Sequence, residues 1–158
     1  MRIGFGYDVH QFTPDRPLWL GGIVVPSERG LKGHSDADMA IHALCDALLG
    51  AAGMRNIGYH FPDTQGNEFE GIDSKVLLRR VMSMLREAGY ELGNCDMTIC
   101  AQAPKLNPYI PAMQDCLAEV MGVAPSQINI KATTSEHMGF IGREEGMAAY
   151  AVALINEQ

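Results

Sequence analysis

The chain has 158 residues, with 12 basic and 19 acidic side chains, which gives a formal net charge of −7 when histidine is neutral. Its 47% apolar and 20% charged residues are typical of a folded globular protein, and residues 1–158 are long enough for a single domain. The negative charge argues against a nucleic-acid partner, whose phosphates it would repel, and no apolar run reaches the ~18 residues that a membrane span needs.

The predicted elements alternate between strands and helices. The first half of the chain is predicted as a strand (2–12), a hairpin (18–25), a loop (26–33), a helix (36–49) and a loop with a helical turn (54–72). The second half is predicted as a helix (73–89), a strand (92–102), a helix (107–121) and two strands (127–134 and 146–155). The expected helix caps are Asp36, then Asp73 or Ser74, then Asn107-Pro108. This order predicts an α/β protein of the α+β two-layer type, in which a mixed β-sheet carries its helices on one face.

The last predicted strand is apolar on both faces over residues 147–155. A strand without a polar side is buried on both sides, so we expect helices or another subunit to cover it.

Two features of the sequence predict a cytoplasmic protein. The first residues lead directly into a patterned strand, without the charged and apolar regions of an export signal. The four cysteines form no CxxC pair and lie in apolar stretches, so we expect reduced, buried thiols at Cys45, Cys95, Cys100 and Cys116.

The strongest chemical pattern combines Asp8 and His10 with His42. Asp8 and His10 share one face of a strand, and a helical histidine completes a three-ligand set that leaves the fourth position of a zinc ion open, as in catalytic zinc sites. Asp38 and Asp46 lie one helical turn either side of His42 and are candidates to orient its ring. The same pattern also fits a core histidine and a turn aspartate.

Three polar segments at the ends of elements are candidate phosphate sites. Residues 33–36 precede a helix, whose free N–H groups attract anions. Residues 131–136 leave a strand with hydroxyls, a lysine and a carboxylate, which suit phosphate oxygens and a hard cation. Residues 101–106 leave another strand and carry one lysine. Each segment can also be read as an ordinary cap or polar loop, but together they suit phosphoryl transfer on a small polyanion.

These segments resemble the 2-C-methyl-D-erythritol 2,4-cyclodiphosphate synthase family of the non-mevalonate isoprenoid pathway. The resemblance covers essentially the whole chain and rests on residues 3–10, 33–38, 42–51, 61–64, 101–105, 131–134 and 139–146. It implies an intramolecular cyclisation, in which the 2-phosphate of 4-diphosphocytidyl-2-C-methyl-D-erythritol 2-phosphate attacks the β-phosphorus of its own diphosphate and expels CMP. It also implies a homotrimer with the sheets toward the centre and the active sites between subunits.

The resemblance implies roles for individual residues. Asp8, His10 and His42 would bind Zn²⁺, and Glu136 would bind Mg²⁺ or Mn²⁺ together with the substrate phosphates. His34 and Thr134 would act in catalysis by stabilising charge in the transition state. The implied substrate-binding residues are Asp8, His10, His34, Ser35, Asn56, Ile57, Gly58, Phe61, Pro62, Asp63, Thr64, Ala101, Ala103, Pro104, Lys105, Leu106, Ala132, Thr133, Thr134, Phe140 and Arg143.

Within that list the resemblance separates three regions. Residues 56–58 and 61–64 would contact the erythritol hydroxyls, whereas residues 101–106 and 132–133 would receive the cytidine diphosphate part. Phe140 and Arg143 would lie near the trimer axis, where a cavity could take an isoprenoid diphosphate. The chain departs from the family pattern at residues 55–56, which read Arg-Asn instead of Gly-Asp, and at Ser135, which replaces a threonine.

Two other functions stay open on the sequence alone. A zinc-dependent phosphohydrolase would use water as the nucleophile and release inorganic phosphate instead of CMP. A metal-dependent binding protein for an isoprenoid or nucleotide diphosphate would show no turnover. The presence of Glu136 and Thr134 favours an enzyme, because a pure binder needs neither a second cation ligand nor a charge-stabilising hydroxyl.

Overall fold

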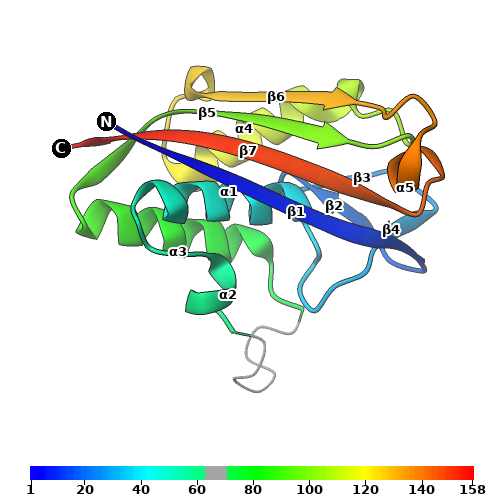
Figure 1. The fold of residues 1–158 in the computed structure, drawn as a ribbon, viewed down its shortest axis with the longest axis horizontal. Coiled ribbons are helices and arrows are strands. Elements are labelled where there is room, and N and C mark those ends of the chain that lie inside the picture. The colour runs from blue at the N-terminus through cyan, green and yellow to red at the C-terminus, as the bar shows by residue number, and fades with distance from the viewer. Residues whose placement is uncertain (63–70) are drawn as a thin grey trace.

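A computed structural model describes residues 1–62 and 71–158, and its centre is a five-stranded mixed sheet in the order β4-β1-β7-β5-β6. The strands are β1 (Arg2–Pro14), β4 (Arg29–Leu31), β5 (Tyr90–Cys100), β6 (Ile128–Thr133) and β7 (Gly146–Glu157), with a separate hairpin of β2 (Leu18–Leu20) and β3 (Ile23–Val25). β5 and β6 run parallel, and every other pair is antiparallel. The sheet strands lie side by side, and both termini are at one end of the molecule (Figure 1).

The helices pack against one face of this sheet, which confirms the predicted arrangement of layers. This layer consists of α1 (Met39–Ala51), α3 (Ser74–Glu87) and α4 (Ile110–Met121). Two single turns complete the helices: α2 (Ile57–His60) packs on α1, and α5 (Gly139–Gly142) contacts β7. Short 3₁₀ helices lie at Asn107–Tyr109 and Pro125–Gln127. α1 lies across β1 and β7, and α4 lies behind β6. Over the described residues, no helix is both long enough and apolar enough to cross a lipid bilayer.

Two predicted boundaries were wrong. The loop predicted at residues 26–33 contains β4, which pairs with the end of β1. The first helix begins at Met39 rather than at Asp36, because Asp38 is the N-cap and its carboxylate accepts a hydrogen bond from the N–H of Ile41 at 3.1 Å. The same buried carboxylate also accepts the two N–H groups of the Gly21-Gly22 turn, at 3.0 and 2.7 Å.

Two glycines bring the backbone of β1 against that of α1. A Cβ atom at Gly4 would lie 1.9 Å from the carbonyl oxygen of Ala47, and one at Gly6 would lie 1.9 Å from that of Ala43. Small side chains on both elements therefore permit a close approach that larger residues would block. Asp8, two residues beyond Gly6 on the same strand face, is thereby placed next to the start of α1.

The opposite face of the sheet is open and apolar in the single chain. Its exposed apolar residues are Ile3, Phe5, Tyr7, Val9, Tyr150 and Val152, and we call this set the open face. Within one chain the helices cover only one side of residues 147–155: Ala149, Ala151 and Ala153 are buried, whereas Tyr150 is 40% exposed, and cover of the other side by another subunit stays a prediction. The pattern alternates because only one face of β7 meets the helices.

The four cysteines are free thiols. Cys45 and Cys95 are buried as expected, but Cys100 and Cys116 are only half-buried. Burial raises the pKa of all four, that of Cys95 to about 12, so these groups are protonated at neutral pH. They are therefore poor nucleophiles and poor metal ligands.

Candidate active site

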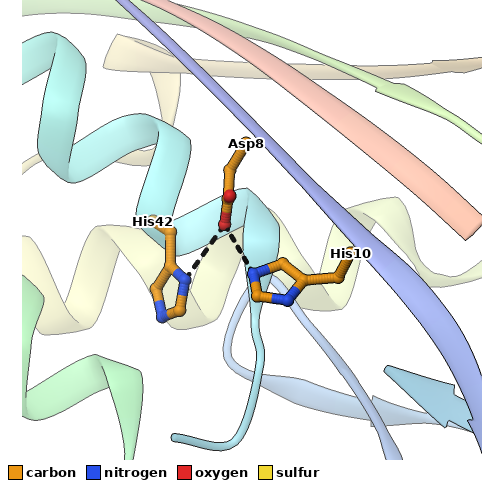
Figure 2. Close-up of side chains that lie close together, drawn as sticks. All are labelled: Asp8, His10 and His42. Carbon is orange, nitrogen blue, oxygen red and sulfur yellow. Dashed lines mark hydrogen bonds and ion pairs between the residues drawn. The ribbon is translucent and has the colours of Figure 1, made fainter. Parts of the chain in front are cut away.

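Asp8, His10 and His42 form one cluster, as the sequence predicted (Figure 2). Asp8 and His10 project from the helix-facing side of β1, and His42 projects from the first turn of α1. The Oδ2 atom of Asp8 lies 2.8 Å from Nε2 of His10 and 3.1 Å from Nδ1 of His42. The three side chains are only 25%, 18% and 12% exposed, so the cluster is largely shielded from water.

This donor set fits a zinc ion. One carboxylate oxygen and two imidazole nitrogens lie within 4.8 Å of one another. Zinc–ligand distances of about 2.0–2.1 Å in a tetrahedral site place ligand atoms about 3.3 Å apart, close to the separations found here. Three protein ligands leave one position for an exchangeable ligand.

The electrostatics of the cluster favour a cation. Burial raises the pKa of Asp8, but the hydrogen bonds from His10 and His42 outweigh it and lower that pKa to about 2. Burial lowers the pKa of His10, yet the bond to Asp8 raises it above its ordinary value. An ionised carboxylate thus lies between two imidazoles and stabilises positive charge beside it.

Hydrogen bonds behind the cluster orient both rings. Nδ1 of His10 lies 2.7 Å from the carbonyl oxygen of Lys32, which can only accept, so Nδ1 carries the proton and Nε2 points to Asp8. Nε2 of His42 lies 3.0 Å from Oγ of Ser74 and 3.2 Å from Oγ of Ser35.

The prediction that Asp38 and Asp46 orient His42 was wrong. The described hydrogen bonds of Asp38 go to backbone N–H groups at Gly21, Gly22 and Ile41. Asp46 accepts the N–H of Ile57 at 2.8 Å and so holds the start of α2. Helical spacing places both carboxylates on the same side of α1 as His42, but backbone N–H groups occupy them as hydrogen-bond donors. Ser74, which sequence analysis treated only as a cap residue, contacts the ring instead.

A cavity of about 530 Å³ opens beside the cluster. Its walls include Asp8, His10, His34, Ser35, His42, Asp46, Ile57, Gly58, Phe61 and Pro62. Asn56 is the N-cap of α2, and its Oδ1 accepts the N–H of Tyr59 at 3.1 Å. Of the predicted erythritol contacts, Asp63 and Thr64 lie outside the described residues.

Arg16 is a supporting residue that the sequence analysis missed. Its guanidinium donates to the carbonyl oxygens of Gly33 and Ser35, at 2.9 and 2.7 Å. These bonds hold the segment that carries His34 at the edge of the cavity. No sequence pattern connects an arginine in a turn to a loop seventeen residues later.

A second cavity, of about 510 Å³, lies at the ends of β5 and β6. Because these strands are parallel neighbours, the segments that follow them meet at one edge of the sheet. Its walls include Ala101, Pro104, Lys105, Leu106, Ala132, Thr133 and Thr134, and Ala103 precedes Pro104 through a cis peptide bond. His34 and Thr134, the two predicted catalytic residues, therefore line different cavities of one chain.

The remaining predicted residues lie beyond the walls of both cavities. Glu136 is exposed, and its N–H donates to Oγ1 of Thr134 at 3.2 Å. Phe140 is on α5 and 39% exposed. Arg143 follows α5 and forms a 2.8 Å ion pair with Glu145.

Comparisons with known proteins agree along the whole chain. Residues 1–156 match the model of the YgbB family. The chain is 65% identical over 155 residues to the 2-C-methyl-D-erythritol 2,4-cyclodiphosphate synthase of Parabacteroides distasonis, covering 98% of this chain and 96% of that protein.

Two solved structures share the fold. The bifunctional IspDF of Campylobacter jejuni is 43% identical with a TM-score of 0.96, and the match covers 99% of this chain but only 42% of that one. IspF of Plasmodium falciparum, solved as a CDP complex, is 30% identical with a TM-score of 0.87, over 99% of this chain and 96% of that one.

Proposed function

This chain belongs to the YgbB family, and from that premise we propose how it carries out the family's reaction. It is a lyase of isoprenoid biosynthesis that converts 4-diphosphocytidyl-2-C-methyl-D-erythritol 2-phosphate into 2-C-methyl-D-erythritol 2,4-cyclodiphosphate and CMP. A 2-phosphate oxygen forms a bond to the β-phosphorus while the bond from that phosphorus to the α,β-bridging oxygen breaks, and CMP leaves with the electron pair. The observation that carries the assignment is the Asp8, His10 and His42 cluster beside the first cavity.

In this proposal Asp8, His10 and His42 hold Zn²⁺, and Glu136 with the substrate phosphates holds Mg²⁺ or Mn²⁺. When bound, these cations would neutralise phosphate charge and polarise the β-phosphorus. His34 and Ser35 hold the attacking 2-phosphate, and His34 and Thr134 stabilise the charge that develops on the phosphoryl oxygens. Cations are needed because a chain of net charge −7 otherwise repels a polyanionic substrate.

The protein's main task is to fold the substrate. Nucleophile and electrophile belong to one molecule, so the pose that brings them together supplies much of the rate. We assign the erythritol part to the first cavity, at Asn56, Ile57, Gly58, Phe61 and Pro62, and to Asp63 and Thr64 beyond the described residues. The cytidine diphosphate part belongs to the second cavity, and the CDP complex of the Plasmodium falciparum relative supports a nucleotide diphosphate ligand.

We further propose a homotrimer with the sheets toward its centre. His34 and Thr134 line separate cavities of one chain, and a second chain that places its Thr134 cavity beside the His34 cavity of the first would unite them in one site. The open face supplies an apolar surface suited to burial between subunits. Phe140 and Arg143 then lie near the axis, as contacts for an isoprenoid diphosphate. Residues 1–158 act as one domain, and the free cysteines support a cytoplasmic location.

The reaction is tested by incubating the protein with the cytidylyl substrate and Mg²⁺ and following phosphorus NMR. We expect CMP and a cyclic diphosphate to appear together. Release of inorganic phosphate would indicate a phosphohydrolase, and binding without turnover would indicate a carrier protein. Either result would refute the cyclase assignment.

Two variants test the two cation sites separately. His42→Ala should lose turnover and hold much less than one zinc per chain, because two remaining ligands do not close the site. Glu136→Gln should keep its zinc while losing activity and Mg²⁺ dependence. Full zinc content in His42→Ala, or loss of zinc in Glu136→Gln, would contradict the two-site scheme.

A further inference from the structure

The two ring nitrogens of His42 have different partners. Nδ1 faces Asp8 at 3.1 Å, inside the cluster, whereas Nε2 lies 3.0 Å from Oγ of Ser74, outside it. Only Nδ1 is placed to bind a cation shared with Asp8 and His10. A ligand nitrogen needs its lone pair, so the ring must then carry its proton on Nε2.

The hydrogen bonds of Ser74 fix the direction of this contact. The hydroxyl of Ser74 donates to Oδ1 of Asp36 in a short bond, and the N–H of Ser74 donates to Oδ2 of Asp36 at 2.8 Å. An ionised carboxylate only accepts, and a hydroxyl has a single proton, so Oγ of Ser74 can only accept from His42. Ser74 is fully buried, so its hydroxyl cannot exchange these hydrogen bonds for bonds to water.

The second hydroxyl near the ring lacks this constraint. Oγ of Ser35 accepts the N–H of Ala37 at 3.1 Å, and its own proton remains able to point toward or away from His42. Ser35 also lines the first cavity, where a substrate competes for it. Without a cation, Nδ1 of His42 donates to Asp8; once a cation takes the place of that proton, the Ser74 contact is the one that holds the remaining ring proton on Nε2.

We infer that Ser74 and Asp36 are positioning residues that hold the proton of His42 on Nε2 and thereby raise the affinity of the cluster for Zn²⁺. The inference rests on the proposed zinc site and adds two residues to it. Asp36 lies before α1 and Ser74 starts α3, so the contact joins two segments that are distant in sequence. Loss of such a partner behind a ligating histidine typically weakens metal binding about 10–100-fold.

The expected effects follow from the hydrogen-bond directions. Ser74→Ala removes the acceptor, so zinc should bind at least about tenfold more weakly. Asp36→Asn replaces one acceptor oxygen by an N–H₂ group that can donate to Ser74. The Ser74 hydroxyl then donates to Nε2 of His42 and moves the ring proton to Nδ1, the ligand atom. The double variant should bind zinc no more weakly than the weaker single variant, because both act through one hydrogen bond.

The test measures zinc dissociation constants by competition with a chromophoric chelator for the whole chain. The variants are Ser74→Ala, Asp36→Asn and their combination, with Ser83→Ala, an exposed serine on α3, as the matched control. Circular dichroism establishes that each variant is folded. We expect both single variants to lose affinity, the double variant to lose no more, and the control to match the unchanged protein.

A second measurement does not depend on any variant folding. In the zinc-loaded unchanged protein, nitrogen-15 NMR of labelled histidine should show the His42 proton on Nε2. A proton on Nδ1, or Ser74→Ala binding zinc within twofold of the unchanged protein, overturns the inference and leaves the zinc site standing. Absence of zinc binding by the unchanged protein refutes the zinc site itself, and the inference with it.

Discussion

Gly6→Ala tests whether the contact between β1 and α1 sets the geometry of the metal cluster. The new Cβ would lie 1.9 Å from the carbonyl oxygen of Ala43 and 2.8 Å from the N–H nitrogen of Ala47. Both neighbours are backbone atoms of a helix, so no side-chain rotation relieves the overlap. Reaching even 3.0 Å from the oxygen requires the strand and helix to separate by about 1.1 Å.

The cost of that separation has two parts. Overpacking in a core typically costs about 1–3 kcal/mol, and a clash with helix backbone belongs at or above the upper end. About 3 kcal/mol corresponds to a fall in melting temperature of about 6–12 °C for a chain of this size. The second part is functional: His42 moves with α1 while Asp8 moves with β1, and metal ligands tolerate distance errors of only about 0.2 Å. Zinc binding and turnover should therefore be lost.

The assay is a thermal melt together with zinc content and CMP release. Gly50→Ala is the matched control, because its Cβ would have Phe5 oxygen as its nearest neighbour at 4.0 Å. Alanine is favoured over glycine by about 1 kcal/mol inside a helix, so this control should melt no lower than the unchanged protein. Gly6→Ala that melts normally and holds one zinc per chain would refute the close backbone contact.

Four further substitutions test other parts of the structure. Phe5 is 62% exposed in one chain, so Phe5→Glu should dissociate the proposed trimer, as measured by light scattering, while the chain keeps its circular dichroism spectrum. Ala151 is only 1% exposed, so Ala151→Glu should instead unfold the chain. Asn56→Asp should change kcat/KM by less than roughly tenfold, because aspartate caps α2 as well as asparagine does, and a hundredfold change in either direction would reveal a role beyond substrate contact. Burial raises the pKa of Asp38 from 3.8 to about 6, so between these pH values the folded chain holds a proton that the unfolded chain has lost. The free energy of unfolding should therefore fall by about 1–3 kcal/mol as pH rises from about 4 to 6. In urea unfolding, Asp38→Asn should lack this dependence of stability on pH.

The local patterns of the sequence predicted much of the cluster. Period-two alternation placed Asp8 and His10 on one strand face, and the structure confirms it. That His42 meets them depends on Gly4 and Gly6, whose role is visible only once a helix lies across the strand. The alternation of β1 also concealed its orientation: the apolar residues point to the open face, and the glycines point to the helices.

The wrong start of the first helix and the wrong choice of ring-orienting carboxylates share one physical cause. Asp36 and Asp38 are both good cap residues, and the sequence does not show which backbone N–H groups surround each of them. Backbone N–H groups of the Gly21-Gly22 turn donate to Asp38, and Ser74 donates to Asp36, so each carboxylate is bound by a segment far away in the chain. Hydrogen-bond partners of this kind are decided by tertiary packing, so spacing along one helix assigned the ring-orienting role to the wrong carboxylates.

The open face makes a newly folded single chain prone to association before it assembles with other copies. A contiguous exposed apolar patch on a sheet drives nonspecific association when no specific partner covers it. If other copies of the chain cover the open face, as in the proposed trimer, part of the folding free energy depends on chain concentration through mass action. Dilution then lowers the melting temperature and the specific activity together, while newly made chains divide between productive assembly and aggregation.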